Sequence, residues 1–183
     1  MRRASIVAAA GLVAVALVGC GTASPSASQP PTSACADDLP ARTSPTDYPL
    51  AVLYVAGDDL PPVVGALEWR GDGEPVTVEP GRPIHLQQFT VLQARGQPEV
   101  SLRMTDGVRI ASWRVEAIPG GLFRSGDLET DRVQWAAGDG PTDIVCVPIR
   151  DGEWAIVADI TFADEAGNAT YYWRLNISET PDA

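Results

Sequence analysis

The sequence has 183 residues, which include 13 arginines, no lysine and 24 acidic residues, so that its formal net charge at pH 7 is −11. This balance excludes binding of nucleic acid or anionic lipid through the field of the protein, because both are themselves anionic. The length is that of one domain of ordinary size.

The chain begins with a stretch that is typical of an export signal. Arg2 and Arg3 precede an apolar run from Ala4 to Val18, which only Ser5 and Gly11 interrupt. At about 1.5 Å per residue, this run is too short to cross a hydrocarbon layer of about 30 Å comfortably. The length and the flanking residues therefore favour a cleaved signal peptide over a membrane-spanning helix.

The apolar run ends in Leu17-Val18-Gly19-Cys20, which resembles the lipobox of bacterial lipoproteins. The resemblance covers residues 1–20 and implies that the Cys20 thiol carries diacylglycerol and that the chain is cut just before it. It also implies an exported protein, anchored by lipid at the extracytoplasmic face of the cell membrane. The mature chain keeps 11 arginines against 24 acidic residues, so lipid rather than charge must hold it there. The composition is similar to that of actinobacterial proteins.

The segment after Cys20 is rich in Ser, Thr, Pro and Ala and lacks apolar periodicity. Such a composition is typical of a flexible tether. We therefore expect a signal peptide over residues 1–19, the lipidated Cys20 with a disordered tether over 20–46, and a folded domain over 47–183.

Three cysteines are present, and lipidation of Cys20 leaves Cys35 and Cys146 as a pair. In an oxidising compartment this pair predicts a disulfide. A bridge closing about 110 residues stabilises by roughly 4–5 kcal/mol in the chain-entropy model. We expect no metal site and no cofactor, because the chain has one histidine and no Cys-x-x-Cys.

From Tyr48 onward, short apolar runs alternate with turn signals. Asp-Gly pairs favour the positive φ angles of tight hairpin turns. They occur at Asp72-Gly73, Asp106-Gly107, Asp139-Gly140 and Asp151-Gly152. The runs that we predict as strands are Leu50–Ala56, Val64–Trp69, Val76–Val78, Ile84–Leu92, Glu99–Met104, Val108–Ala117, Val133–Ala136, Ile144–Pro148, Glu153–Phe162 and Thr170–Ile177.

The last two runs form the clearest predicted hairpin, because Trp154 and Ile156 alternate on one strand and Tyr171 and Trp173 on the next. This hairpin looks like the last two strands of immunoglobulin-like domains in bacterial secreted proteins, a resemblance that concerns the fold alone. No long helix is predicted. The many short strands and turns favour an all-β, immunoglobulin-like β-sandwich.

No catalytic constellation stands out in the sequence. His85 is the single histidine and is expected to be a surface or hydrogen-bonded strand residue, and no Gly-x-Ser-x-Gly motif is present. Acidic pairs in predicted turns, such as Asp58-Asp59 and Asp164-Glu165, could supply oxygen ligands to Ca²⁺, although none fits an EF-hand loop. Paired carboxylates could also serve a hydrolase.

The five tryptophans fall into two groups by their place in the predicted strands. Trp113, Trp154 and Trp173 alternate with apolar residues and are expected in the core, whereas Trp69 and Trp135 end their runs and are the candidate ligand-contact aromatics.

From these features we expect a non-enzymatic binding or scaffolding module with no catalytic residues. Its expected partners are an envelope protein or a glycan, and not nucleic acid. The alternatives are a small-ligand or Ca²⁺-binding β domain and, third, a hydrolase.

Overall fold

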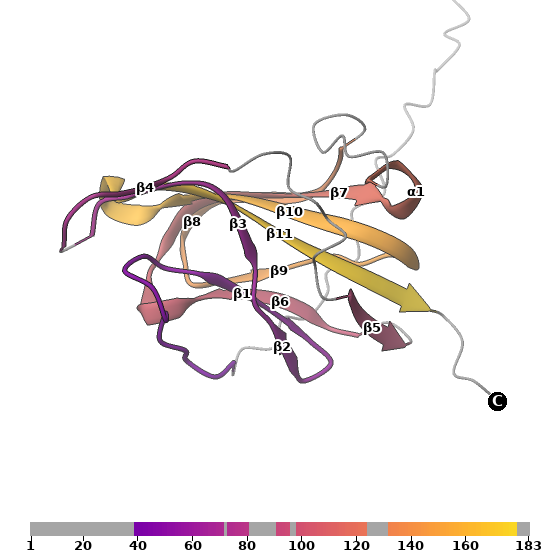
Figure 1. Ribbon diagram of the computed structural model, residues 1–183. Helices are drawn as coiled ribbons and strands as arrows, with labels where there is room; N and C mark the ends of the chain where they lie inside the picture. The colour runs from indigo at the N-terminus through magenta and orange to yellow at the C-terminus, as the bar shows by residue number, and fades with distance from the viewer. Residues whose placement is uncertain (1–38, 72, 81–90, 96–97, 124–131, 179–183) are drawn as a thin grey trace, which may run out of the picture.

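In the computed structural model, the described residues are 39–71, 73–80, 91–95, 98–123 and 132–178, and they form two sheets packed face to face (Figure 1). The pairs within each sheet are antiparallel except for β5, which runs parallel to β11. The prediction of an all-β, immunoglobulin-like β-sandwich is confirmed.

The smaller sheet has the order β2-β1-β6-β9, and the larger has the order β4-β3-β11-β10-β7-β8 with β5 beside β11. The strands are β1 (Ala51–Val55), β2 (Asp58–Leu60), β3 (Val63–Trp69), β4 (Val76–Val78), β5 (Val91–Arg95), β6 (Val100–Met104), β7 (Ile110–Pro119), β8 (Val133–Thr142), β9 (Ile144–Cys146), β10 (Gly152–Phe162) and β11 (Gly167–Ser178). The helical segments are η2 (Thr105–Gly107), α1 (Gly120–Phe123) and η3 (Ala163–Glu165).

Most predicted strands are found within a few residues of their expected bounds, and the predicted final hairpin is the β10–β11 pair. Among the described residues, the helical segments are no longer than four residues, in agreement with the prediction of no long helix. The part of the chain that the structure describes also contains no helix long and apolar enough to cross a membrane.

The sequence prediction differs from the structure in three places. Strand β2 was expected to be a loop, but Ala56 and Gly57 have positive φ and fold Asp58–Leu60 back onto β1. Asp106-Gly107 does not close a hairpin, since it connects β6 and β7, which belong to different sheets. Asp139-Gly140 lies inside β8. Most of the predicted strand Ile84–Leu92 lies outside the described residues.

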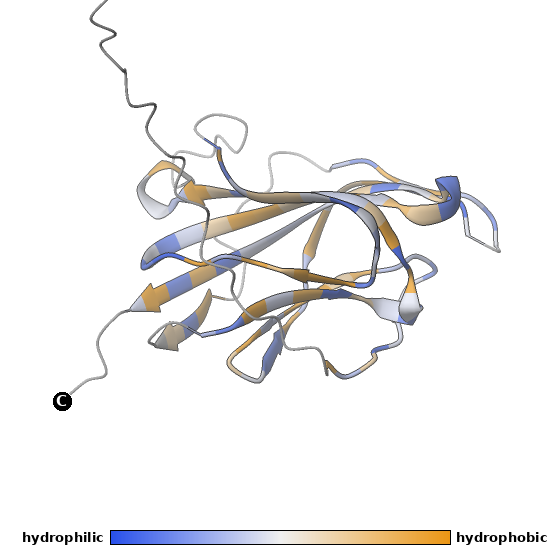
Figure 2. Cartoon of the chain, turned by 180° about the vertical axis from the view of Figure 1, so that it is seen from behind, coloured by the Kyte–Doolittle hydropathy of each residue, from blue (hydrophilic) through white to orange (hydrophobic). Residues whose placement is uncertain are grey.

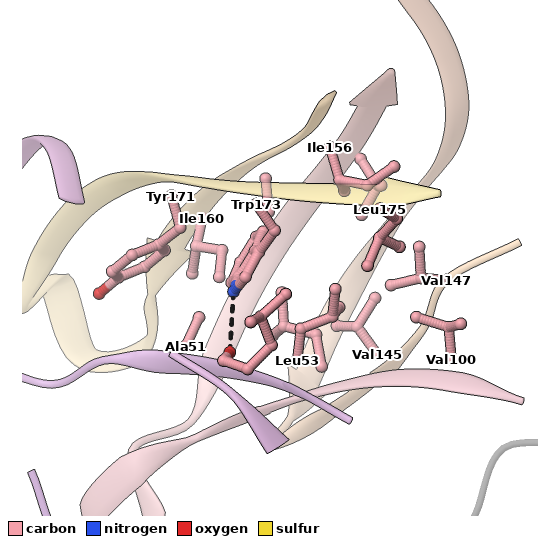
Figure 3. Packing of buried hydrophobic residues seen from close by; sticks show 14 of the residues in the cluster. Ala51, Leu53, Val100, Val145, Val147, Ile156, Ile160, Tyr171, Trp173 and Leu175 are labelled. Carbon is pink, nitrogen blue, oxygen red and sulfur yellow. Dashed lines mark hydrogen bonds between the residues drawn. The ribbon is translucent and has the colours of Figure 1, made fainter. Parts of the chain in front are cut away.

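The core lies between the sheets and is built from the inward-facing residues of both (Figure 3). Trp173 is 1% exposed, and its indole Nε1 donates a hydrogen bond to the Leu60 carbonyl of the opposite sheet at 3.1 Å. Trp113 and Trp154 are half-buried and pack against this core, as expected. Because the indole donor of Trp173 is satisfied, burying the large ring leaves no unpaired polar group there.

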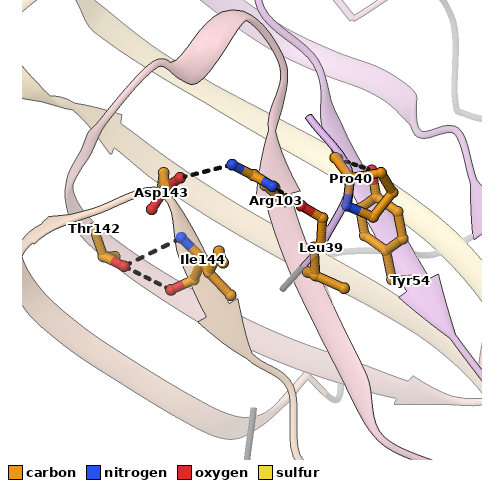
Figure 4. Close-up of polar contacts among 7 residues, drawn as sticks. All are labelled: Leu39, Pro40, Tyr54, Arg103, Thr142, Asp143 and Ile144. Atoms are coloured by element: carbon orange, nitrogen blue, oxygen red, sulfur yellow. Dashed lines mark hydrogen bonds and ion pairs between the residues drawn. The ribbon is translucent and has the colours of Figure 1, made fainter. Parts of the chain in front are cut away.

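The segment 39–48, which we call the strap, begins against the outer face of the smaller sheet, where Leu39 and Pro40 lie beside Arg103 and Tyr54 (Figure 4). Tyr54 on β1 donates its hydroxyl to the Pro40 carbonyl at 3.0 Å, and the Arg103 guanidinium on β6 donates to the Leu39 carbonyl. Arg103 also pairs with Asp143 at 3.4 Å. Both outward-facing side chains thus bind the strap backbone rather than water.

Charged groups fix the strap at its middle. Arg42 pairs with Asp59 at 2.6 Å, and the Arg42 carbonyl accepts the Asp106 N–H at 2.9 Å. The Asp106 carboxylate in turn accepts the Ser44 N–H at 3.1 Å. Residues 39–46, assigned above to the tether, are therefore in contact with the sandwich, and the folded unit begins before the expected boundary at residue 47.

The strap continues into Pro49, whose carbonyl accepts the buried Tyr171 hydroxyl at 2.7 Å. Burial raises the pKa of Tyr171 well above its usual range, and nearby Tyr48 raises it further. Tyr171 therefore keeps its proton and its hydrogen bond at alkaline pH.

Candidate functional site

Three connections meet at one end of the sandwich, on the left in Figure 1: the turn after β3, η2 with the residues after it, and η3. They are tied together by backbone hydrogen bonds. The Arg70 N–H donates to the Ala166 carbonyl at 2.8 Å, and the Ala163 N–H donates to the Arg109 carbonyl at 2.9 Å. We call this region the loop end.

Acidic residues occupy the strained turn positions of the loop end. Asp106 in η2 and Asp164 and Glu165 in η3 have φ between 56° and 57°. Asp adopts this left-handed region more readily than most residues because its short polar side chain can hydrogen-bond locally. The turn at η3 is strongly hydrophilic (Figure 2). The positive φ angles of these turns thus account for carboxylates around the loop end, whether or not the carboxylates also bind a ligand.

Trp69 ends β3 at the loop end and is half-buried. Its ring meets Phe162 edge to face, with centroids 5.2 Å apart and planes at 85°. The same ring lies so close to Gly71 that a Cβ there would come within 2.6 Å of it. Phe162 and Gly71 together hold the indole in one orientation, with part of the side chain left open.

The open side of Trp69 contributes to a cavity of about 630 Å³ at the loop end. Its charged lining consists of Arg70, Arg109, Asp106 and Asp164. Asp106 is already engaged by the strap, and Arg70 lies 3.8 Å from Glu68. The cavity combines an aromatic wall with balanced charges, a lining suited to an uncharged ligand that carries both apolar and hydrogen-bonding groups.

The second candidate aromatic, Trp135, lies elsewhere. It is 7% exposed within the core and packs edge to face on Trp154, with centroids 5.0 Å apart. Its buried indole N–H has no hydrogen-bond partner in the part of the chain that the structure describes. A ring buried in this way offers no open face to a ligand. Of the two candidates, the structure therefore brings only Trp69 to a cavity.

Of the three cysteines, the structure describes Cys146 alone. Cys20 and Cys35 lie outside the described residues, as does His85. Cys146 lies half-buried on β9 directly opposite Ser101, and it is not a free thiol. The pairing of Cys35 with Cys146 remains a prediction.

The calcium alternative depends on a convergence of acidic groups. Within the described ranges, no three or more His, Cys, Asp or Glu side chains gather as they would around a metal ion. Asp59 is instead engaged with Arg42, and Asp106 with the strap.

Sequence reasoning missed the arginines of the cavity. Arg70 and Arg109 follow ordinary strand and turn patterns, and only the fold brings them together. The turn signal at Asp106-Gly107 marked one of the three connections, but no local pattern could show that all three meet beside Trp69.

No protein-family model matches the chain, and no curated protein matches it in sequence. Similar solved structures include a lytic polysaccharide monooxygenase from Jonesia denitrificans, with 10% identity and a TM-score of 0.34 over 50% of this chain and 60% of that one. An AA10 lytic polysaccharide monooxygenase from Streptomyces lividans has 12% identity and a TM-score of 0.37 over 48% and 59%. A chitin-binding domain from Burkholderia pseudomallei has 16% identity and a TM-score of 0.31 over 49% and 57%.

These matches correct two expectations. The expectation of a non-enzymatic binding or scaffolding module, and with it the expectation that the chain is not an enzyme, is wrong as stated, because the similar structures include the two monooxygenases named above. The fold class gives no ground for excluding catalysis. The matches span less than two thirds of those proteins, and at these identities and TM-scores they assign no activity to this chain.

Proposed function

We propose that the loop-end cavity recognises carbohydrate, and that the chain presents this cavity outside the cytoplasmic membrane by means of lipid on Cys20. The observation that carries the proposal is the partly open Trp69 ring beside Arg70, Arg109 and Asp164. A sugar ring has an apolar C–H face and a rim of hydroxyls. An indole covers the first, and carboxylate and guanidinium groups hydrogen-bond the second.

The charge of the protein supports a ligand that is not strongly charged. The formal net charge of −11 disfavours nucleic acid and other polyanions. The cavity itself contains two arginines and two aspartates, so its own field is weak. An uncharged, polyhydroxylated ligand is not repelled by the net negative charge of the protein, and it does not need a strong field in the cavity. The proposal concerns recognition and does not depend on whether a reaction follows.

Calorimetric titration of the purified protein with neutral cello-, xylo-, manno- and chito-hexasaccharides tests this proposal. Binding of at least one hexasaccharide is expected, weakened about tenfold or more by Trp69→Leu, which keeps the apolar contact with Phe162 but removes the aromatic face. Arg109→Gln should also weaken binding. Arg150→Gln is the matched control, because Arg150 is exposed and does not line the cavity. Absence of binding to every sugar, or equal binding by Trp69→Leu, would contradict the proposal.

The lipid anchor is a separate part of the proposal. Cys20→Ala should block lipidation and change where the protein fractionates, because the proposed acyl chains are attached to the Cys20 thiol. Mass spectrometry of the wild-type N-terminus provides the matching readout. An unmodified wild-type Cys20 together with unchanged membrane retention of the variant would refute the anchor.

A disulfide between Cys35 and Cys146 would secure the strap. Cys146 shares the outer face of the smaller sheet with Tyr54 and Arg103, the residues that bind the strap. Three residues lie between Cys35 and Leu39, and the span from one to the other is at most about 14 Å, so the bond would fix the segment just before the strap. Non-reducing peptide mapping should recover the two cysteines in one linked peptide, whereas two free thiols would exclude the bond.

A further inference from the structure

A second hollow, of about 520 Å³, lies on the outer face of the larger sheet, across β8, β7, β10 and β11. Its polar lining includes Ser112, Arg114, Asp139, Asp159, Thr161 and Asn168. We call this region the polar face. It differs from the rest of the same outer face, where Ala155, Val157 and Tyr172 are buried.

The strand register arranges the polar face in two rows. Asp139, Ser112, Thr161 and Asn168 stand opposite one another on successive strands. Arg114, Asp159 and Thr170 form the next row. Since neighbouring strands lie about 4.8 Å apart, each row presents a polar side chain at that interval.

Much of the hydrogen-bonding capacity of these rows is unused. Arg114 and Asp159 are direct cross-strand neighbours but do not pair, because Asp159 accepts the Thr170 hydroxyl at 2.7 Å and lies 3.9 Å from Arg132. Within the part of the chain that the structure describes, the side chains of Arg114, Thr161 and Asn168 have no hydrogen-bond or ion-pair partner. These groups are open to a ligand.

The polar face and the loop-end cavity lie close together along the chain. Thr161 precedes Ala163 of the cavity by two residues, and Asn168 follows Ala166 by two, a distance of about 7 Å along extended chain. Gly167 lies between Ala166 and Asn168, and its backbone runs so close to β3 that a Cβ on it would lie 2.0 Å from the Glu68 carbonyl oxygen. The two hollows are thus separated by the ends of β10 and β11 that η3 joins.

We propose that the polar face and the loop-end cavity form one continuous path for a linear, uncharged polysaccharide, with one unit at Trp69 and the following units on the polar face. This inference rests on the proposed function and adds to it that the ligand is a polymer. Hydroxyl, amide and charged groups at regular intervals match a chain that repeats hydroxyls along its length. An extended peptide fits less well, because it would need apolar pockets for alternate side chains, and the polar face supplies none.

The test compares neutral oligosaccharides of increasing length, from the disaccharide to the hexasaccharide, in calorimetric titrations of the purified protein. The path predicts that affinity rises about tenfold or more with length. The double variant Thr161→Ala/Asn168→Ala should keep the affinity for the disaccharide and lose the gain with length. Thr77→Ala, at an exposed position of β4 outside both hollows, is the matched control and should behave as the wild type.

Each outcome decides a different claim. A hexasaccharide that binds no tighter than the disaccharide would overturn the continuous path and leave the loop-end cavity as the binding site. Loss of disaccharide binding in the double variant would also overturn it, because the polar face would then be part of the first subsite. Equal affinity for hexaglycine would show that an extended peptide is the occupant. No binding of any sugar would refute the proposed function itself.

Discussion

The outer faces of the two sheets are used in opposite ways. On the smaller sheet, Tyr54 and Ser101 point outward yet are 6% and 2% exposed, and the strap binds across them. On the larger sheet, Arg114 and Thr161 also point outward and are exposed, with unused hydrogen-bonding groups. The strap thus covers part of one face and contributes to stability, while the polar face of the larger sheet remains open to a ligand.

Removal of the strap should lower the free energy of unfolding more than any other change to the two faces. A chain beginning at residue 47 loses the hydrogen bonds that Leu39 and Pro40 accept and the ion pair of Arg42, and it uncovers Tyr54. Exposing one large side chain costs about 2–3 kcal/mol, before the lost hydrogen bonds are counted. Denaturant unfolding should therefore give a much lower free energy of unfolding than for a chain beginning at residue 39. Equal stabilities would mean that the strap does not cover a structural face.

Gly167→Ala should have the next largest effect on the free energy of unfolding, because Gly167 begins β11 in close contact with the backbone of β3. Gly167 has φ +118°, and a Cβ there would overlap the Glu68 carbonyl. The combined backbone strain and clash should lower the free energy of unfolding by about 2–4 kcal/mol. Gly73→Ala is the control, since a Cβ at Gly73 would meet nothing within 4 Å, and it should change stability by less than about 0.5 kcal/mol. Similar losses in the two variants would contradict the strain and clash at Gly167.

Tyr171→Phe tests the attachment between the strap and the core. Loss of the hydrogen bond to the Pro49 carbonyl should cost about 1 kcal/mol at neutral pH. The pKa of Tyr171 is raised in the folded state, so above about pH 10 the unfolded chain releases this proton while the folded protein keeps it. The wild-type free energy of unfolding should then fall by about 1.4 kcal/mol per pH unit from this group, and Tyr171→Phe should remove that part of the slope. Unfolding curves between pH 9 and 11 measure it, and an unchanged slope would contradict the burial of this hydroxyl.

The smallest effects are expected from two hydroxyl deletions, one on each face. The buried Ser101 hydroxyl has no hydrogen-bond partner among the described residues, so Ser101→Ala should leave stability unchanged or raise it by up to about 1 kcal/mol. Thr161→Ala removes an exposed group and should change stability by less than about 0.5 kcal/mol. A marked loss in Ser101→Ala would reveal a bond that the buried hydroxyl makes in solution.

The difference between the two faces also shows what a sequence can predict. Alternation in β10 and β11 predicted their pairing, because period-two patterns are local and Trp154, Ile156 and Trp173 must share the core side. The short strand β2 was missed because Asp58 and Asp59 are polar and the turn at Ala56-Gly57 gives no strong signal. Proline and serine content suggested a tether up to residue 46, yet carbonyls of the strap bind side chains of the smaller sheet. The amino-acid composition does not show which backbone carbonyls accept hydrogen bonds from the sheet.

Two residues that line the candidate site, Trp69 and Asp164, were singled out from the sequence. Trp69 stood out because it ends an apolar run, a position from which an aromatic ring can reach a loop. Trp135 had the same local pattern and proved buried, since β8 brings it onto Trp154. Arg70 and Arg109 reach the site because three connections meet there, which depends on the order of strands in both sheets and not on any neighbouring residue.

Carbohydrate recognition at the loop end is tested most directly by an NMR titration of the ¹⁵N-labelled protein with the neutral hexasaccharides. We expect amide shifts to move first at Trp69, Arg70, Arg109 and Ala163 around the loop-end cavity, and next at Thr161 and Asn168. The Leu39 amide, at the end of the strap away from Asp106, should stay unchanged. Shifts confined to the strap, or no shifts with any sugar, would contradict recognition at this end of the sandwich.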